Sequence, residues 1–96
     1  MTENALNSYL FVIDSSTMSR DDAMDKINEI REVENWQKIL PDAAVLISRL
    51  ATKPLNDLLR ESLGNQRYIV AKLGSKNGWL AKNSWDFMNN PTSVFE

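Results

Sequence analysis

Short apolar runs alternate along this chain with segments in which apolar residues recur at helical spacing. Residues 9–13 form a continuous apolar, β-favouring run, which is typical of a strand buried on both faces of a sheet. In residues 19–33, Ala23 and Ile27 begin an apolar stripe with charged residues on the other side, so we expect an amphipathic helix. Residues 36–40 are more polar, which favours a strand at the edge of a sheet.

The same order of patterns then occurs a second time. Residues 43–49 are strongly apolar, residues 52–63 carry leucines at helical spacing, and residues 68–73 are again half polar. The chain therefore predicts the order β-α-β-β-α-β, the ferredoxin-like arrangement of the α+β class, with a four-stranded antiparallel sheet and both helices on one face. The two most apolar runs are the first and third strands, which this topology places at the centre of the sheet.

Residues with capping preferences mark the ends of both predicted helices. Ser19 and Asp22 have the spacing of a capping box at the start of the first helix. Thr52 is the predicted N-cap of the second helix, and Pro54 lies in its first turn, where a missing N–H has little effect. Gly64 stands where the second helix needs a left-handed residue at its C-terminus.

A segment rich in aromatic residues follows the four predicted strands. We expect a single domain over residues 1–96, with a core at 9–73 and a C-terminal aromatic extension at 74–96, in which residues 79–88 form a short helix. Aromatic side chains bury roughly 150–250 Å² each, so the extension either covers the open face of its own sheet or docks on a second protomer. The candidate dimer-interface residues are Trp79, Trp85 and Phe87.

The composition excludes several kinds of chemistry. The 96-residue chain has no cysteine and no histidine, which excludes disulfides, a thiolate nucleophile, a histidine base and a cysteine zinc site. A bound metal is therefore expected to be a hard cation such as Mg²⁺, Mn²⁺ or Ca²⁺. The formal net charge is −2 and the 11 Lys and Arg residues are dispersed, which disfavours broad electrostatic binding to duplex nucleic acid.

The location of the protein is also an expectation from the sequence. No apolar run reaches the ~20 residues that a membrane-spanning helix needs. The first residues lack the basic flank and long apolar stretch of a signal peptide. We therefore expect a cytoplasmic protein that does not associate with membranes.

Three stretches of the chain resemble a known family. They are the first strand ending in Asp14, the block at residues 43–73, and the tail with Gly78-Trp79-Leu80 followed by Trp85-Asp86. Over roughly residues 9–88 the chain resembles the small Cas-two-like ferredoxin-fold proteins, which are named after the second CRISPR-associated protein. Within that family it is most similar to a bacterial subgroup called SinR-like, whose members tend to close with a Gly-Trp-Leu segment and a Trp-Asp pair.

The resemblance implies a function and a site. Members of the family form homodimers through the sheet and have been described as metal-dependent nucleases. Their functional aspartate lies at the end of the first strand, where this chain has Asp14. By resemblance, Asp14 is the candidate catalytic residue and the ligand of Mg²⁺ or Mn²⁺, paired with Asp14 of a second protomer. RNA or DNA, bound weakly, is then the expected substrate.

Each of these residues also has a simpler structural interpretation. Asp14 can act as a turn aspartate that accepts a hydrogen bond from its own backbone. Ser15 and Ser16 are candidate phosphate contacts, but loop serines are common turn formers. Arg20 can reach a phosphate, whereas Asp21 and Asp22 beside it favour the positive end of the helix dipole.

Two functions from different classes therefore remain open. The first is a homodimeric, weakly active, metal-dependent endonuclease that acts on RNA or DNA through Asp14. The second is a non-catalytic dimeric interaction or regulatory module, such as a defence-system or toxin–antitoxin accessory protein with its own protein partner. The resemblance favours the first function, and the low positive charge and absent histidine favour the second. A small-molecule sensor of the ACT type shares the topology, but no motif supports it.

Overall fold

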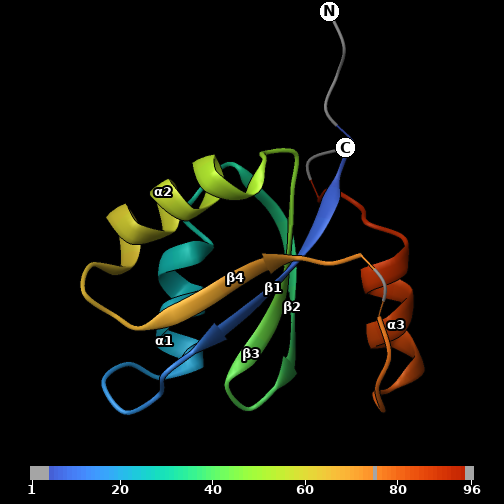
Figure 1. Cartoon of the computed structure of the whole chain (residues 1–96), viewed down its shortest axis with the longest axis horizontal. Helices are drawn as coiled ribbons and strands as arrows, with labels where there is room; N and C mark the ends of the chain where they lie inside the picture. Colours follow the sequence, from blue (N-terminus) through green and yellow to red (C-terminus); the bar gives the residue numbers. More distant parts are fainter. Residues whose placement is uncertain (1–4, 75, 95–96) are drawn as a thin grey trace, which may run out of the picture.

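The structure is a computed structural model that describes residues 5–74 and 76–94, so residues 1–4, Ser75 and residues 95–96 of the predicted domain lie outside the described residues. Four strands and three helices alternate along the chain (Figure 1). In chain order they are β1 (Asn7–Ile13), α1 (Arg20–Ile27), β2 (Val33–Leu40), β3 (Ala43–Ser48), α2 (Thr52–Leu63), β4 (Tyr68–Lys72) and α3 (Lys82–Asn89).

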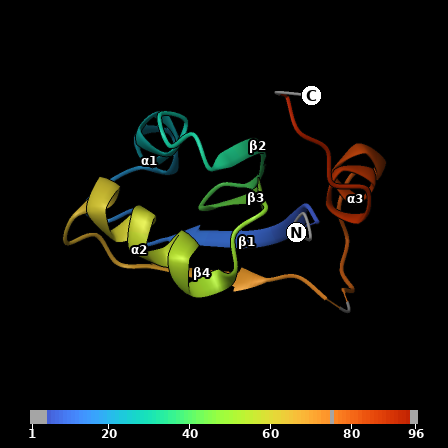
Figure 2. The ribbon, with the colours of Figure 1, turned by 90° about the horizontal axis from the view of Figure 1, so that it is seen from above.

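The strands form one antiparallel sheet in the order β2-β3-β1-β4. Helices α1 and α2 cover one face of this sheet, and α3 lies against the opposite face (Figure 2). The first and third strands are central, and the second and fourth are at the edges, as the sequence predicts. The α+β, ferredoxin-like fold with a short C-terminal helix is therefore confirmed.

The main core lies between the sheet and helices α1 and α2. Alternate residues of β1, Tyr9 and Phe11, point into it, because successive side chains of a strand lie on opposite faces. Helix α2 contributes Leu55, Leu59 and Leu63, which recur at helical spacing on its buried side. All six residues of β3 are buried, since this strand has a neighbour on each side and a packed layer on each face.

A second, smaller core lies on the opposite face, under α3. Met88 of α3 packs there against Val45 and Ile47 of β3. The hydroxyl of Ser8 donates a 2.7 Å hydrogen bond to the carbonyl of Met88, which holds the end of α3 on β1. The helical part of the aromatic extension therefore covers its own sheet, which is one of the two arrangements that the sequence left open; docking of the extension on a second protomer stays a prediction.

The chain after α3 returns to the edge strand β2. The backbone N–H of Val94 donates to the carbonyl of Glu34 at 3.0 Å. The side-chain amide of Asn35 donates to the carbonyl of Thr92 at 3.1 Å. These bonds satisfy polar groups at the start of the β2 edge and fix the path of the C-terminal segment.

The first helix is shorter than the sequence predicts. It ends at Ile27 instead of residue 33, and β2 begins at Val33 instead of residue 36. The apolar residues Ile30 and Val33 fit the helical period, but Val33 pairs with Ser48 of β3 and is buried in the main core. Pairing along the sheet therefore replaces a last helical turn, which is a tertiary effect that local periodicity does not contain.

The helix caps agree with the sequence at two positions and differ at a third. Ser19 is the N-cap of α1, and its hydroxyl accepts a 3.1 Å hydrogen bond from the N–H of Asp22. Gly64 ends α2 with a φ of +69°, a region in which a side chain is strained. The prediction that Thr52 is the N-cap of α2 was wrong, because Ala51 holds that position and makes no side-chain cap bond.

The third helix also starts later than its aromatic pattern suggests, at Lys82 instead of residue 79. Gly78 and the residues next to it form an extended entry into the helix. Within the part of the chain that the structure describes, no helix has both the length and the apolar character needed to cross a membrane.

Leu59→Ala should destabilise the fold by about 2–5 kcal/mol, because Leu59 is fully buried and its truncation leaves a cavity in the main core. Leu58→Ala is the matched control, since Leu58 lies on the same helix but is only half-buried. Urea unfolding followed by circular dichroism measures both free energies. Equal losses for the two variants would contradict the assigned core.

Candidate functional site

Asp14 lies directly after β1, where three segments far apart in the sequence meet. Its backbone N–H donates to the carbonyl of Arg67 at 2.8 Å, just before β4 begins. The N–H of Ile13 donates to the carbonyl of Asp42 at 3.0 Å, in the turn between β2 and β3. Figure 1 shows β1 ending beside the start of β4. The sheet topology therefore brings Asp14, Asp42 and Arg67 to the same end of the sheet; we call this the acidic end.

The carboxylate of Asp14 is exposed and ionised at neutral pH. Its Oδ1 accepts a 3.0 Å hydrogen bond from the backbone N–H of Ser16. This hydrogen bond, followed by one from the Ser16 side chain, lowers the pKa of Asp14, and the positive charge of Arg67 adds to the effect. The contact from Ser16 is the one that the turn-aspartate interpretation predicts.

Ser15 follows Asp14 in the chain and contacts the other acidic residue of this end, Asp42. Its hydroxyl donates a 2.5 Å hydrogen bond to Oδ1 of Asp42. Ser15 therefore links the loop after β1 to the β2–β3 turn, and Ser16 donates a hydrogen bond to Asp14. Thr17, in the same loop, donates to Oε1 of Gln66 at 2.5 Å and links the loop to the segment before β4.

Asp42 is a residue of this end that sequence reasoning missed as a candidate. The Pro41-Asp42 pair reads as a simple turn between the second and third strands, and the structure confirms that turn. The signal that could have found it is the predicted pairing of the first and third strands. In that antiparallel pair Val12 is the partner of Ala43, so the residue before Ala43 must lie near the end of β1.

Arg20 is engaged in contacts within the protein. One of its nitrogens donates to the carbonyl of Leu40 at 2.5 Å, which ties the start of α1 to the end of β2. Its other nitrogens bind Asp21 at 2.9 and 3.1 Å, and Lys38 also reaches Asp21 at 2.9 Å. Lys38 first and Arg20 second lower the pKa of Asp21. In the structure Arg20 thus links α1 to the end of β2, and its contact with phosphate stays a prediction.

The acidic end offers few ligands to a metal ion within one chain. Among residues 5–74 and 76–94, no group of three or more Asp, Glu, His or Cys residues is placed to hold a metal. Asp14 and Asp42 are oxygen donors of the kind that Mg²⁺ and Mn²⁺ prefer, but these cations take about six ligands. Asp14 also lines a shallow hollow of about 350 Å³ together with Arg67 and Ile69.

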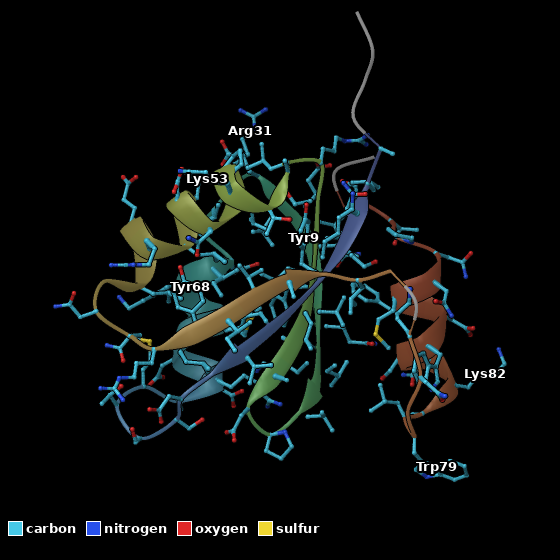
Figure 3. All side chains as sticks on the ribbon, in the orientation of Figure 1. Tyr9, Arg31, Lys53, Tyr68, Trp79 and Lys82 are labelled. Atoms are coloured by element: carbon cyan, nitrogen blue, oxygen red, sulfur yellow. The ribbon has the colours of Figure 1, made fainter. Side chains whose placement is uncertain are left out.

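The three candidate interface residues are not equivalent. Trp85 and Phe87 are half-buried against the second core, on the chain's own sheet. Trp79 is 98% exposed, and Figure 3 shows its ring pointing away from the molecule. Trp85 and Phe87 thus pack on the chain's own sheet, whereas Trp79 borders the same hollow as Trp85 but remains exposed.

A row of apolar residues next to the acidic end is left uncovered by α3. Cross-strand pairing places Leu40, Ala43, Val12 and Ile69 side by side across all four strands, and the alternation along β1 turns this row away from α1 and α2. The exposed fractions are 49% for Leu40, 36% for Val12 and 68% for Ile69, whereas the small side chain of Ala43 between Leu40 and Val12 is buried. We call these four residues the apolar row. Sequence reasoning did not single it out.

Comparison of the chain with protein-family models, with curated proteins and with solved structures finds no match. The resemblance to the Cas-two-like proteins therefore stays a prediction, as do the metal and the nucleic acid that it implies. The site has to be judged on its own geometry.

The pKa of Asp14 should lie below the ordinary aspartate value of 3.8, because hydrogen bonds from Ser16 favour the carboxylate. The associated stability is present above the ordinary pKa and is lost as the pH falls through the lowered one. Carbon-detected NMR titration of the carboxyl groups measures this value. Ser16→Ala should raise the pKa of Asp14 more than Arg67→Gln does, since the hydroxyl has the larger effect. A pKa at or above 3.8 would contradict this geometry.

Proposed function

We propose that this protein is a homodimeric interaction module whose contact surface is the apolar row. The observation that carries the proposal is the exposure of the cross-strand partners Val12 and Ile69 on one face of the sheet, with exposed Leu40 beyond the buried Ala43. Contiguous apolar surface on a small protein is typical of a contact site, whereas single exposed apolar residues are common everywhere.

The position of the row supports a contact with protein. Helix α3 covers the part of this sheet face that includes Val45 and Ile47, so the same face continues from a covered region into the open row. The row contains no charged residue. Burying its side chains in a contact stabilises the complex by roughly 25 cal/mol for each Å² of apolar surface. The edge strand β4 extends this surface with Ile69, its most exposed large apolar side chain.

The charges around the acidic end support the same function. Nucleic-acid binding needs several cations that are available to phosphates, but at this end Arg67 is next to the carboxylate of Asp14, and Arg20 and Lys38 both contact Asp21. Asp14 and Asp42 add negative charge beside the row, and the formal net charge of the chain is −2. An apolar centre with a charged rim is the usual composition of a protein–protein contact.

Ile69→Lys should shift the protein from dimer to monomer, because removing the water around an ammonium group in an apolar contact is costly even with Asp14 nearby. Val94→Lys is the matched control: Val94 is 64% exposed, close to the 68% of Ile69, but it lies outside the row near β2. Multi-angle light scattering over a range of concentrations measures the mass. A monomeric wild-type protein, or equal effects of the two variants, would reject the proposal.

A second candidate function is the metal-dependent endonuclease acting on RNA or DNA. It is favoured by the meeting of Asp14 and Asp42 at one end of the sheet, joined through Ser15. If a two-fold axis passed near this end, carboxylates of two protomers could hold one Mg²⁺ or Mn²⁺ and orient a water molecule for attack on phosphorus.

If this second function is correct, labelled single-stranded RNA is cleaved with Mn²⁺ and intact with EDTA, and Asp14→Ala abolishes the cleavage. Asp57→Ala should cleave normally, because Asp57 is an exposed residue of α2 that pairs with Lys53 at 3.1 Å. Gel electrophoresis of the RNA measures the rates. Absent cleavage, or cleavage that survives Asp14→Ala, would reject the endonuclease and leave the interaction module.

A further inference from the structure

Trp79 is an unusual residue because its large apolar ring is almost entirely in water. It is 98% exposed, although tryptophan generally buries most of its surface in folded proteins. Its ring points away from the molecule beyond the start of α3 (Figure 3). An exposed tryptophan of this kind is typical of a residue that is buried when a partner binds.

An apolar groove lies beside Trp79. Its floor is formed by Leu10, Ile39 and Leu40 of the sheet, and its wall by Leu80, Trp85 and Met88 of the extension. The groove has a volume of about 380 Å³, at the lower end of the ~300–1,000 Å³ range of pockets that enclose small molecules, so one indole ring is a suitable occupant. Leu40 belongs to both the groove and the apolar row, so the two surfaces are continuous.

Gly78 lies next to the ring of Trp85, one residue before Trp79. Its φ is +157°, and a side chain placed there would meet the ring of Trp85 at 3.7 Å. The backbone of Gly78 therefore passes close to the ring of Trp85 while the next residue, Trp79, faces solvent. Trp79 is at the rim of the groove of its own chain and does not fill it.

We propose that Trp79 of each protomer inserts into the apolar groove of the partner, so that two copies exchange these rings reciprocally. The proposal rests on the homodimer proposed above and specifies how it forms. A projecting ring and a groove that fits it are present on one chain, next to each other, which is the self-complementary arrangement that a two-fold interface requires.

The area involved fits a dimer of moderate affinity. Each inserted ring buries ~150–250 Å² of its own surface and covers a similar area of groove, so two rings account for about 600–1,000 Å². This is below the ~1,200–2,000 Å² of a stable interface, and the adjoining apolar rows supply additional area. We therefore expect a dimer that dissociates on dilution.

The experiment compares Trp79→Ala with Trp79→Phe by analytical ultracentrifugation. Loss of the ring should raise the dimer dissociation constant by about ten-fold or more, whereas phenylalanine should retain most of the affinity. The free energy of unfolding at a concentration where the protein is monomeric should not change, because the ring is exposed in the single chain. This rules out misfolding as the cause.

The outcomes separate this inference from the function that it rests on. If Ile69→Lys dissociates the dimer while Trp79→Ala leaves its affinity unchanged, the exchange of Trp79 is rejected and the apolar row remains the interface. If the wild-type protein is monomeric at every concentration, both are rejected.

Discussion

The antiparallel pairing of β1 with β3 is the constraint on which the other features of this protein depend. It makes both strands central, so that their side chains fill the cores on the two faces of the sheet. It also aligns Val12 with Ala43 and thereby sets Asp14 next to the β2–β3 turn. Because side chains alternate along a strand, a shift of this register by one residue would exchange the side chains that face α1 and α2 with those that face α3. The core, the acidic end and the apolar row therefore have one common origin.

The length of the C-terminal extension explains why part of the sheet remains open. A face of a four-stranded sheet needs a packed layer over its whole apolar area, and the eight residues of α3 cover only some of it. Met88 and the hydrogen bond from Ser8 hold the helix over Val45 and Ile47. The row that contains Val12 lies beyond this cover. Within the extension, Trp79 lies next to that opening. The least covered part of the face and the most exposed aromatic ring are therefore neighbours.

The sequence was sufficient for features that follow from local pattern. The two apolar central strands, the cap at Ser19 and the left-handed Gly64 could all be predicted, because each depends on neighbouring residues. The end of α1 could not, since Val33 fits either a helix or a strand and its choice depends on pairing with Ser48. Asp42 was missed for the same reason: its place beside Asp14 is a property of the folded sheet. The sequence also could not show that Trp85 and Phe87 are partly covered while Trp79 is exposed, because this depends on how the extension packs on the folded sheet.

The position of the acidic end beside the apolar row links the two candidate functions physically. Any protomer that covers the row approaches Asp14 and Asp42 of its partner, and like charges brought together in a partly dry interface repel strongly. The positive charge of Arg67 beside Asp14 offsets part of this repulsion, and two arrangements relieve the rest. Either the carboxylates stay at the solvated rim, where they limit how far the two sheets overlap, or a divalent cation lies between them. In the single chain the hydrogen bond from Ser16 lowers the pKa of Asp14 and so favours the carboxylate. In the proposed dimer, the lateral offset of the two protomers would therefore determine whether these carboxylates act as a spacer or as a metal site.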